Sequence, residues 1–204
     1  MITTVSYPNT LIRLRKGEIA RYARCSYAQA NRQIDEAAAE TEVAAVYRVC
    51  FDLFPIKRTD AWLQIGCIST QSEDLSRRLA GCEQAIVFAA TVGVGIDRLI
   101  QKYNRLSPAK SIFLHAAGSE AAEALCNRFC ADIAQKFGEL RPRFSPGYGD
   151  LPLTTQKDVF TALSCTKNIG VTLSDSMLML PSKSVTAIVG VISNVNGDAI
   201  YERS

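Results

Sequence analysis

The stretch CEQAIVFAATVG, residues 82–93, predicts a buried strand in this chain of 204 residues. It is an apolar run with β-branched and aromatic side chains that stops at Gly93, which is typical of a strand inside a core. The residues that follow, IDRLIQKYNRL (96–106), have apolar side chains at helical spacing and predict an amphipathic helix. A buried strand next to an amphipathic helix indicates a fold that mixes strands and helices.

A second, longer helix is predicted directly after the first. Ser107-Pro108 is a strong helix start, with serine as the N-cap and proline in the first turn. The helix can continue to Phe137, with Gly138 as its stop, so that it would span roughly 45 Å. Because this length is unusual, we expect a bend or a break at Gly118.

The other elements follow from the same kinds of pattern. Upstream we expect two helices at residues 15–24 and 27–46, followed by two strands at residues 47–56 and 61–68. A short helix is expected from Ser72 to Leu79. Downstream we expect a Pro/Gly-rich loop at residues 139–153 and a helix from Thr154 or Thr155 through Ser164. The remainder is predicted to be strand, most clearly over residues 185–192. No repeat or linker is visible, so the sequence predicts one α+β domain over residues 1–204.

The composition argues against several classes of protein. Apolar residues make up 48% of the chain, enough for a sizeable core, and no apolar run reaches the ~18–20 residues that a membrane helix needs. The N-terminus shows no secretory signal, so we expect a cytoplasmic protein. The net charge of +3 is distributed without a basic stripe and aromatic platforms, so we expect no nucleic-acid partner.

The seven cysteines form no pattern typical of a metal site. Cys126 and Cys130 are spaced i,i+4 on the predicted long helix and could supply two thiolates, but the chain has no second pair and no CxxC. Most of the cysteines have apolar neighbours, where a free thiol packs as a small hydrophobe. We therefore predict reduced, structural cysteines and no bound metal.

The segment RFSPGYGD, residues 143–150, is the strongest candidate for a functional loop. Pro146 fixes its own φ and forms, with Gly147, the pair favoured at the centre of a type II turn. The loop should be stiff, and Gly147 lets a ligand approach the backbone. Arg143 offers a planar set of donors suited to a carboxylate or phosphate. The residues alone leave two interpretations open: a site for a small anion, or a rigid surface turn whose arginine pairs with a nearby acid.

The loop also resembles the S-adenosylmethionine motif RxxxGY of the activation domain of cobalamin-dependent methionine synthase. The likeness extends over roughly residues 82–190 and is weak over residues 1–80; its pieces are AIVFAATVG (85–93), AAEAL (121–125), GDLPLTTQK (149–157) and LSDSMLMLP (173–181). An early aspartate and a C-terminal tyrosine pair of the family have no counterpart. The resemblance implies a free-standing relative of that domain, α+β and C-shaped, with a central, mainly antiparallel sheet flanked by helices.

The resemblance also assigns roles to residues by their position in the motif. Arg143 is expected to grip the carboxylate of the methionine moiety. Glu123 is expected to face the cationic end of the ligand, with Glu120, one turn earlier, as its competitor. The turn is expected to contact the ligand through its backbone and ring, at Pro146, Gly147 and Tyr148.

By the same resemblance, the domain binds S-adenosylmethionine and presents its methyl group to cob(I)alamin, which reactivates methionine synthase after its cofactor oxidises. The chain would be an accessory part of a methyltransferase system in methionine biosynthesis, with no catalytic side chain of its own, since it only positions the methyl group. Cobalamin is expected on a partner: a methionine synthase that lacks its own activation domain, or another corrinoid protein. His115 and Gly118 match half of the cobalamin motif DxHxxG, but Phe113 replaces its aspartate and the stretch is predicted to be helical.

Two alternatives come from other classes of protein. Gly93 and Gly95, between a strand and a helix, are similar to a dinucleotide-binding loop and would indicate a nucleotide-cofactor enzyme, although the third glycine is absent. The second alternative is an interaction or regulatory module that kept the fold and lost the ligand, which the missing early aspartate favours.

Overall fold

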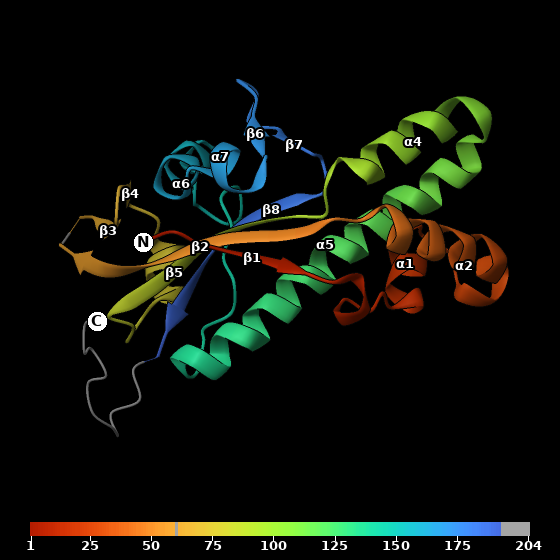
Figure 1. Cartoon of the computed structure of the whole chain (residues 1–204). Helices are drawn as coiled ribbons and strands as arrows, with labels where there is room; N and C mark the ends of the chain where they lie inside the picture. The colour runs from red at the N-terminus through yellow and green to blue at the C-terminus, as the bar shows by residue number, and fades with distance from the viewer. Residues whose placement is uncertain (60, 193–204) are drawn as a thin grey trace.

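The computed structural model describes residues 1–59 and 61–192 and is built on one antiparallel sheet (Figure 1). The strand order is β4-β3-β2-β5-β8, and β1 also pairs with the long strand β2. The registered pairs of this sheet are all antiparallel in the described residues. The strands are β1 (Thr3–Tyr7), β2 (Tyr47–Arg58), β3 (Leu63–Ile65), β4 (Ile68–Thr70), β5 (Gln84–Thr91) and β8 (Ser184–Val191).

The predicted strand at residues 82–93 is β5, which lies between β2 and β8. Its side chains alternate between two cores: Ile86 and Phe88 face one, Val87 and Ala89 the other. Nearly every residue of β5 is buried, because helices cover both faces of the sheet. The unbroken apolar run in the sequence reflects this double burial.

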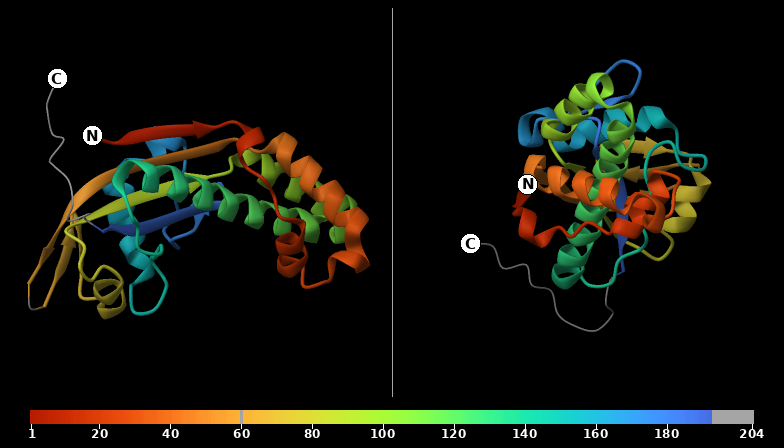
Figure 2. Two further views of the ribbon diagram at one scale, coloured as in Figure 1. Left: turned by 90° about the horizontal axis from the view of Figure 1, so that it is seen from below. Right: turned by 90° about the vertical axis from the view of Figure 1, so that its right-hand side faces the viewer.

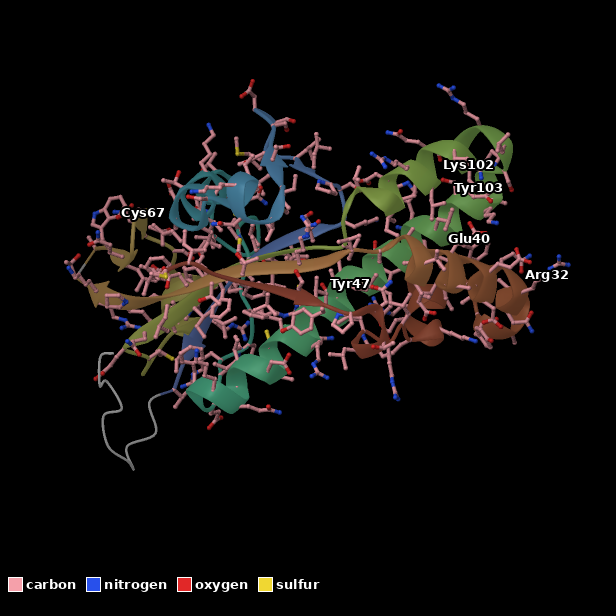
Figure 3. All side chains as sticks on the ribbon, viewed as in Figure 1. Arg32, Glu40, Tyr47, Cys67, Lys102 and Tyr103 are labelled. Atoms are coloured by element: carbon pink, nitrogen blue, oxygen red, sulfur yellow. The ribbon has the colours of Figure 1, made fainter. Side chains whose placement is uncertain are left out.

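One face of the sheet packs on a group of four helices, two before β2 and two after β5. They are α1 (Lys16–Tyr22), α2 (Tyr27–Ala44), α4 (Val94–Leu106) and α5 (Pro108–Phe137). The first half of α5 continues past the sheet beside α1, α2 and α4, and we call this extension the helical arm. Figure 2 shows that the arm curves away from the sheet, which gives the molecule a C shape. Glu40 and Tyr103 lie near each other on the arm (Figure 3), where Lys110 contacts both of them.

The other face of the sheet is covered by short elements. They are α3 (Glu73–Arg78), α6 (Gln156–Leu163), α7 (Cys165–Ile169) and a two-stranded ribbon of β6 (Thr172–Leu173) and β7 (Met179–Leu180). Two 3₁₀ turns, Asn9–Leu11 and Leu153–Thr155, complete the described elements. The predicted fold class, a C-shaped α+β fold with a central antiparallel sheet between helices, is confirmed.

The predicted break at Gly118 is wrong, because α5 runs without interruption from Pro108 to Phe137. Gly118 is there for packing: a Cβ at this position would lie 2.8 Å from Cγ2 of Ile96 and 3.1 Å from Cγ of Lys183. The glycine lets α4 and the loop before β8 approach the helix closely. This glycine is needed for a tertiary contact, which the local sequence does not show.

Three further expectations differ from the structure. Residues 61–68 form parts of two strands, since Gly66 has φ +59° and reverses the chain between β3 and β4. Residues 165–169 form the short helix α7, which Gly170 ends in a left-handed conformation, where strand was predicted. The first strand, β1, was not predicted. The partners of β1 and α7 lie far away in the sequence, whereas β3 and β4 are neighbouring segments that pair with each other.

The alternative of a dinucleotide-binding enzyme loses its structural context. Gly93 precedes α4, but β5 pairs antiparallel with both of its neighbours, whereas such a loop belongs to a parallel β-α-β unit. A Cβ on Gly95 would collide with the backbone carbonyl of Ala44, so this glycine allows α4 to pack against the end of α2. In the described part of the chain, no helix combines the length and apolar character needed to span a bilayer.

Candidate functional site

The predicted turn at residues 145–148 is present. The amide of Tyr148 donates to the carbonyl oxygen of Ser145 at 3.1 Å, and Gly147 has φ +90°, as a type II turn requires at its third position. The amide of Gly147 also donates to the carbonyl of Leu151 at 2.9 Å. The Pro146-Gly147 pair therefore forms a closed, stiff bend.

Asp150 anchors this bend to the helix α3. Its carboxylate accepts hydrogen bonds from the amides of Glu73 at 2.7 Å and Asp74 at 3.2 Å, and from the hydroxyl of Ser72. The hydrogen bond from Ser72, together with those amides, lowers the pKa of Asp150. Ser72 is the N-cap predicted from the sequence and accepts from the amide of Leu75 at 3.0 Å. The second cap, Asp150, lies 77 positions from Glu73 and has no local signal.

A cavity of about 420 Å³ lies beside the turn. It lies at the outer edge of β8, with α5 on one side and the start of α6 on the other. Its volume is within the range of small-molecule sites, ≈ 300–1,000 Å³. Its lining residues come from five helices and strands and from the loop at residues 143–148: Arg78, Glu123, Arg143, Phe144, Ser145, Pro146, Tyr148, Gln156, Met179, Ser184, Val185 and Thr186.

Four of the five predicted ligand residues line this cavity: Arg143, Glu123, Pro146 and Tyr148. The fifth, Gly147, shapes the turn without lining the cavity. Tyr148 is largely exposed, so its ring is free to contact a ligand. The structure thus gathers residues from α5 and the loop, 20 positions apart for Arg143 and Glu123. Whether they bind a ligand stays a prediction.

Arg143 is held by two partners on α5. Its Nη2 donates to Oε2 of Glu123 at 3.0 Å and to Oδ1 of Asn127 at 2.9 Å. Glu123 and Asn127 are spaced i,i+4 and therefore share one face of the helix. The arginine faces the cavity and also pairs with an acid, so both interpretations that the residues left open describe part of its environment.

The groups around Arg143 keep its guanidinium ionised. Burial opposes the charged guanidinium, but Cys126 and Glu123 outweigh it and raise the pKa of Arg143. Burial also raises the pKa of the Cys126 thiol to about 12, so this group is neutral at pH 7. Glu123 is consequently the charge that stabilises the guanidinium.

The competitor Glu120 lies elsewhere. Its side chain is fully buried and accepts from Nε of Arg15 at 2.9 Å and from the backbone amide of Arg15 at 3.2 Å. It ties α5 to the start of α1 and does not line the cavity. Of the two helical glutamates, only Glu123 is at the site.

Two lining residues that the sequence did not single out carry buried polar atoms. Oε1 of Gln156 and Oγ1 of Thr186 are both buried and have no hydrogen-bond partner among the described residues. Gln156 begins α6 and Thr186 lies on β8. Buried polar atoms are rarely left without a partner. The signal for this feature in the sequence was a threonine that follows Ser184 and Val185 and precedes the apolar run AIVGV.

Cysteines and histidine show no sign of a metal centre in residues 1–59 and 61–192, where no three potential ligands cluster. The seven cysteines are free thiols, and four of them are buried. Cys67, the exposed one, lies at the β3–β4 end of the molecule, far from Arg32 on the helical arm (Figure 3). His115 lies within the continuous helix α5, as predicted.

Comparisons with known proteins bear on the family resemblance and on the fold. Residues 130–196 match the family described as "Vitamin B12 dependent methionine synthase, activation domain". The fold matches the crystal structure of the MetH reactivation domain bound to AdoHcy with a TM-score of 0.74 and 16% identity, over 98% of this chain and 81% of that chain. No curated protein matches the sequence significantly. The predicted resemblance is therefore confirmed by the sequence of one segment, which includes Arg143 and Tyr148, and by the fold of nearly the whole chain.

Proposed function

Because this chain resembles the activation domain of vitamin B12-dependent methionine synthase in both sequence and fold, we propose that its cavity binds S-adenosylmethionine. The observation that carries the proposal is the placement of Arg143 and Glu123 on one wall of a cavity of suitable size. The similar solved domain has AdoHcy bound, which is the demethylated form of this ligand.

The pair of opposite charges suits an amino-acid zwitterion. Arg143 would bind the carboxylate of the methionine moiety, and Glu123 would bind its ammonium group. Without ligand the two side chains neutralise each other at 3.0 Å. The ligand would replace this one contact with two charge-assisted hydrogen bonds, each worth about 1.5–3 kcal/mol. Asn127, which also holds Arg143, would keep the guanidinium oriented.

The turn would hold the middle of the ligand. Tyr148 lines the cavity with its ring, and an aromatic ring attracts a cation such as a sulfonium. Pro146 is buried and Gly147 fixes the bend, so the backbone beside the ligand is rigid. This part of the site would orient the methyl group that the ligand donates.

The role of this chain would then be to position the methyl donor. The corrinoid supplies the nucleophile for methyl transfer, and the residues of this chain would bind and orient the methyl donor, a proximity effect. We propose that the corrinoid is carried by a partner, a methionine synthase without its own activation domain or another corrinoid protein. The chain would act in methionine biosynthesis in the cytoplasm, as one domain over residues 1–204.

Titration calorimetry with S-adenosylhomocysteine and S-adenosylmethionine tests the proposal. We expect Arg143→Ala to weaken both affinities by about 10- to 150-fold, the equivalent of one charge-assisted hydrogen bond. Arg141→Ala is the matched control, since Arg141 is two residues away, exposed, and bonded to the carbonyl of Ala80. The affinity of Arg141→Ala for both ligands should equal that of the wild type.

Two results would reject the proposal in different ways. Equal heats from the wild type and Arg143→Ala would reject the role of Arg143. No heat from the wild type would instead favour a regulatory module that kept the fold and lost the ligand.

A further inference from the structure

Resting on the proposed function, we propose that the outer edge of β8 at Ser184 and Thr186, with which no described residue pairs, forms together with Gln156 the subsite that recognises the adenine of the ligand. Neither the motif at residues 143–148 nor the charge pair of Arg143 and Glu123 supplies groups of this kind. The subsite is defined by backbone direction and by two buried side chains.

The backbone evidence comes from the segment that covers the lower half of β8. Phe144 and Ile188 exchange both of their amide hydrogen bonds, at 2.9 and 2.8 Å, and Arg141 donates to the carbonyl of Gly190 at 2.8 Å. The N–H and C=O groups of Ile188 and Gly190 therefore point away from β5. Because these groups alternate along a strand, those of Ser184 and Thr186 point the same way. At these two residues the outer edge meets the cavity.

The side-chain evidence is independent of the backbone. Thr186 is 2% exposed and Gln156 is 6% exposed, and the Oγ1 and Oε1 atoms of these residues have no partner in the described part of the chain. Both side chains line the same cavity. Leaving such groups unpaired destabilises a protein, and a ligand in this cavity would supply partners for both.

These groups match the polar edge of adenine. The C=O of Ser184 and the N–H of Thr186 are an acceptor and a donor on one strand edge, two residues apart. Adenine presents the complement, an amino donor beside a ring nitrogen acceptor. Oγ1 of Thr186 and Oε1 of Gln156 would take the remaining polar atoms of the nucleoside. The inverse pattern of hypoxanthine, which has an acceptor beside a donor, would face the strand with like groups.

Calorimetry with two ligands and three variants tests the subsite. S-adenosylhomocysteine is compared with S-inosylhomocysteine, which differs in the purine edge alone. We expect the inosine compound to bind the wild type at least about tenfold more weakly, because buried partners would be left unpaired. Thr186→Val and Gln156→Leu should each weaken S-adenosylhomocysteine by about 5- to 20-fold.

Thr41→Val is the matched control for Thr186→Val. Thr41 lies on α2, and its hydroxyl is also buried without a partner in the described residues, but it does not line the cavity. Both substitutions replace an unpartnered hydroxyl with a methyl group, so both should keep or raise the melting temperature of the ligand-free protein. Only Thr186→Val should change the affinity.

The outcomes separate this inference from the proposed function. Equal binding of the two purines, or unchanged affinity in Thr186→Val and Gln156→Leu while Arg143→Ala is weakened, would overturn the subsite and leave the proposed function intact. Absence of binding in the wild type would overturn both. A weakening in Thr41→Val equal to that in Thr186→Val would show a general effect of the substitution and also reject the subsite.

Discussion

The charge pair of Arg143 and Glu123 should matter much more for binding than for folding. The two atoms Nη2 and Oε2 are 3.0 Å apart, but the side chains are 24% and 39% exposed, so water screens their attraction. A pair of this kind contributes about 0–1 kcal/mol to stability. We therefore expect Glu123→Gln to change the free energy of unfolding by less than about 1 kcal/mol. The same substitution removes the charge that would face the ligand's ammonium, which should weaken S-adenosylhomocysteine by about 10- to 150-fold.

Urea denaturation and calorimetry measure the two quantities on the same preparations. Methylthioadenosine, which lacks the amino-acid tail, is the control ligand, and its affinity should be the same in the wild type, Glu123→Gln and Arg143→Ala. A loss of more than about 2 kcal/mol of stability with unchanged ligand affinity would refute the assignment. In that case the pair would be structural.

The pair of Arg15 and Glu120 offers an internal contrast. The carboxylate of Glu120 is fully buried, so Arg15→Ala would leave a charge in the core without its partner. We expect this variant to lower the melting temperature well below that of Arg143→Ala and to bind S-adenosylhomocysteine like the wild type. The reverse ranking of the two variants would contradict the separation into a binding pair and a structural pair.

Two further predictions concern the frame of the site. Gly118→Ala should destabilise the protein by about 0–2 kcal/mol in urea, because crowding against Ile96 costs about 1–3 kcal/mol and the better helix propensity of alanine returns about 1 kcal/mol. Gly17→Ala, with nothing within 4 Å of its Cβ, should stabilise the protein by about 0.5–1 kcal/mol. Equal gains in stability in both variants would contradict the packing argument. The lowered pKa of Asp150 means that its stabilisation is complete above the ordinary pKa of 3.8 and is lost as the pH falls below it toward the folded value. The difference in melting temperature between the wild type and Asp150→Asn should therefore shrink from pH 7 to pH 3, and a constant difference would contradict this linkage.

The sequence predicted the elements whose signals are local. The apolar run of β5, the serine cap of α3 and the Pro146-Gly147 bend depend on neighbouring residues, and each is present. The β3–β4 hairpin also had a local signal, since Gly66 stands between two short alternating segments and two-residue hairpin turns favour glycine. A single strand was predicted over residues 61–68.

The other features that the sequence did not predict depend on distant partners. Gly118 was expected to break the helix, although its role is to admit Ile96 and Lys183. The cap that Asp150 provides and the position of Thr186 beside the cavity require the tertiary fold. The resemblance identified Arg143, Glu123 and the turn at residues 146–148, but it did not single out the three residues proposed to contact adenine, Gln156, Ser184 and Thr186.

The unbroken helix and the uncovered strand edge together explain why a site forms at this place. Because α5 is continuous, Glu123 and Asn127 stay on one face and hold Arg143 against the sheet. Residues 140–144 pair with the lower half of β8, and no other residue that the structure describes pairs with this edge where the cavity begins. The amino-acid end and the adenine end of the ligand would thus be fixed by a helix and a strand. Methyl transfer depends on the position of one carbon, and rigid elements at both ends of the donor fix that position better than loops would.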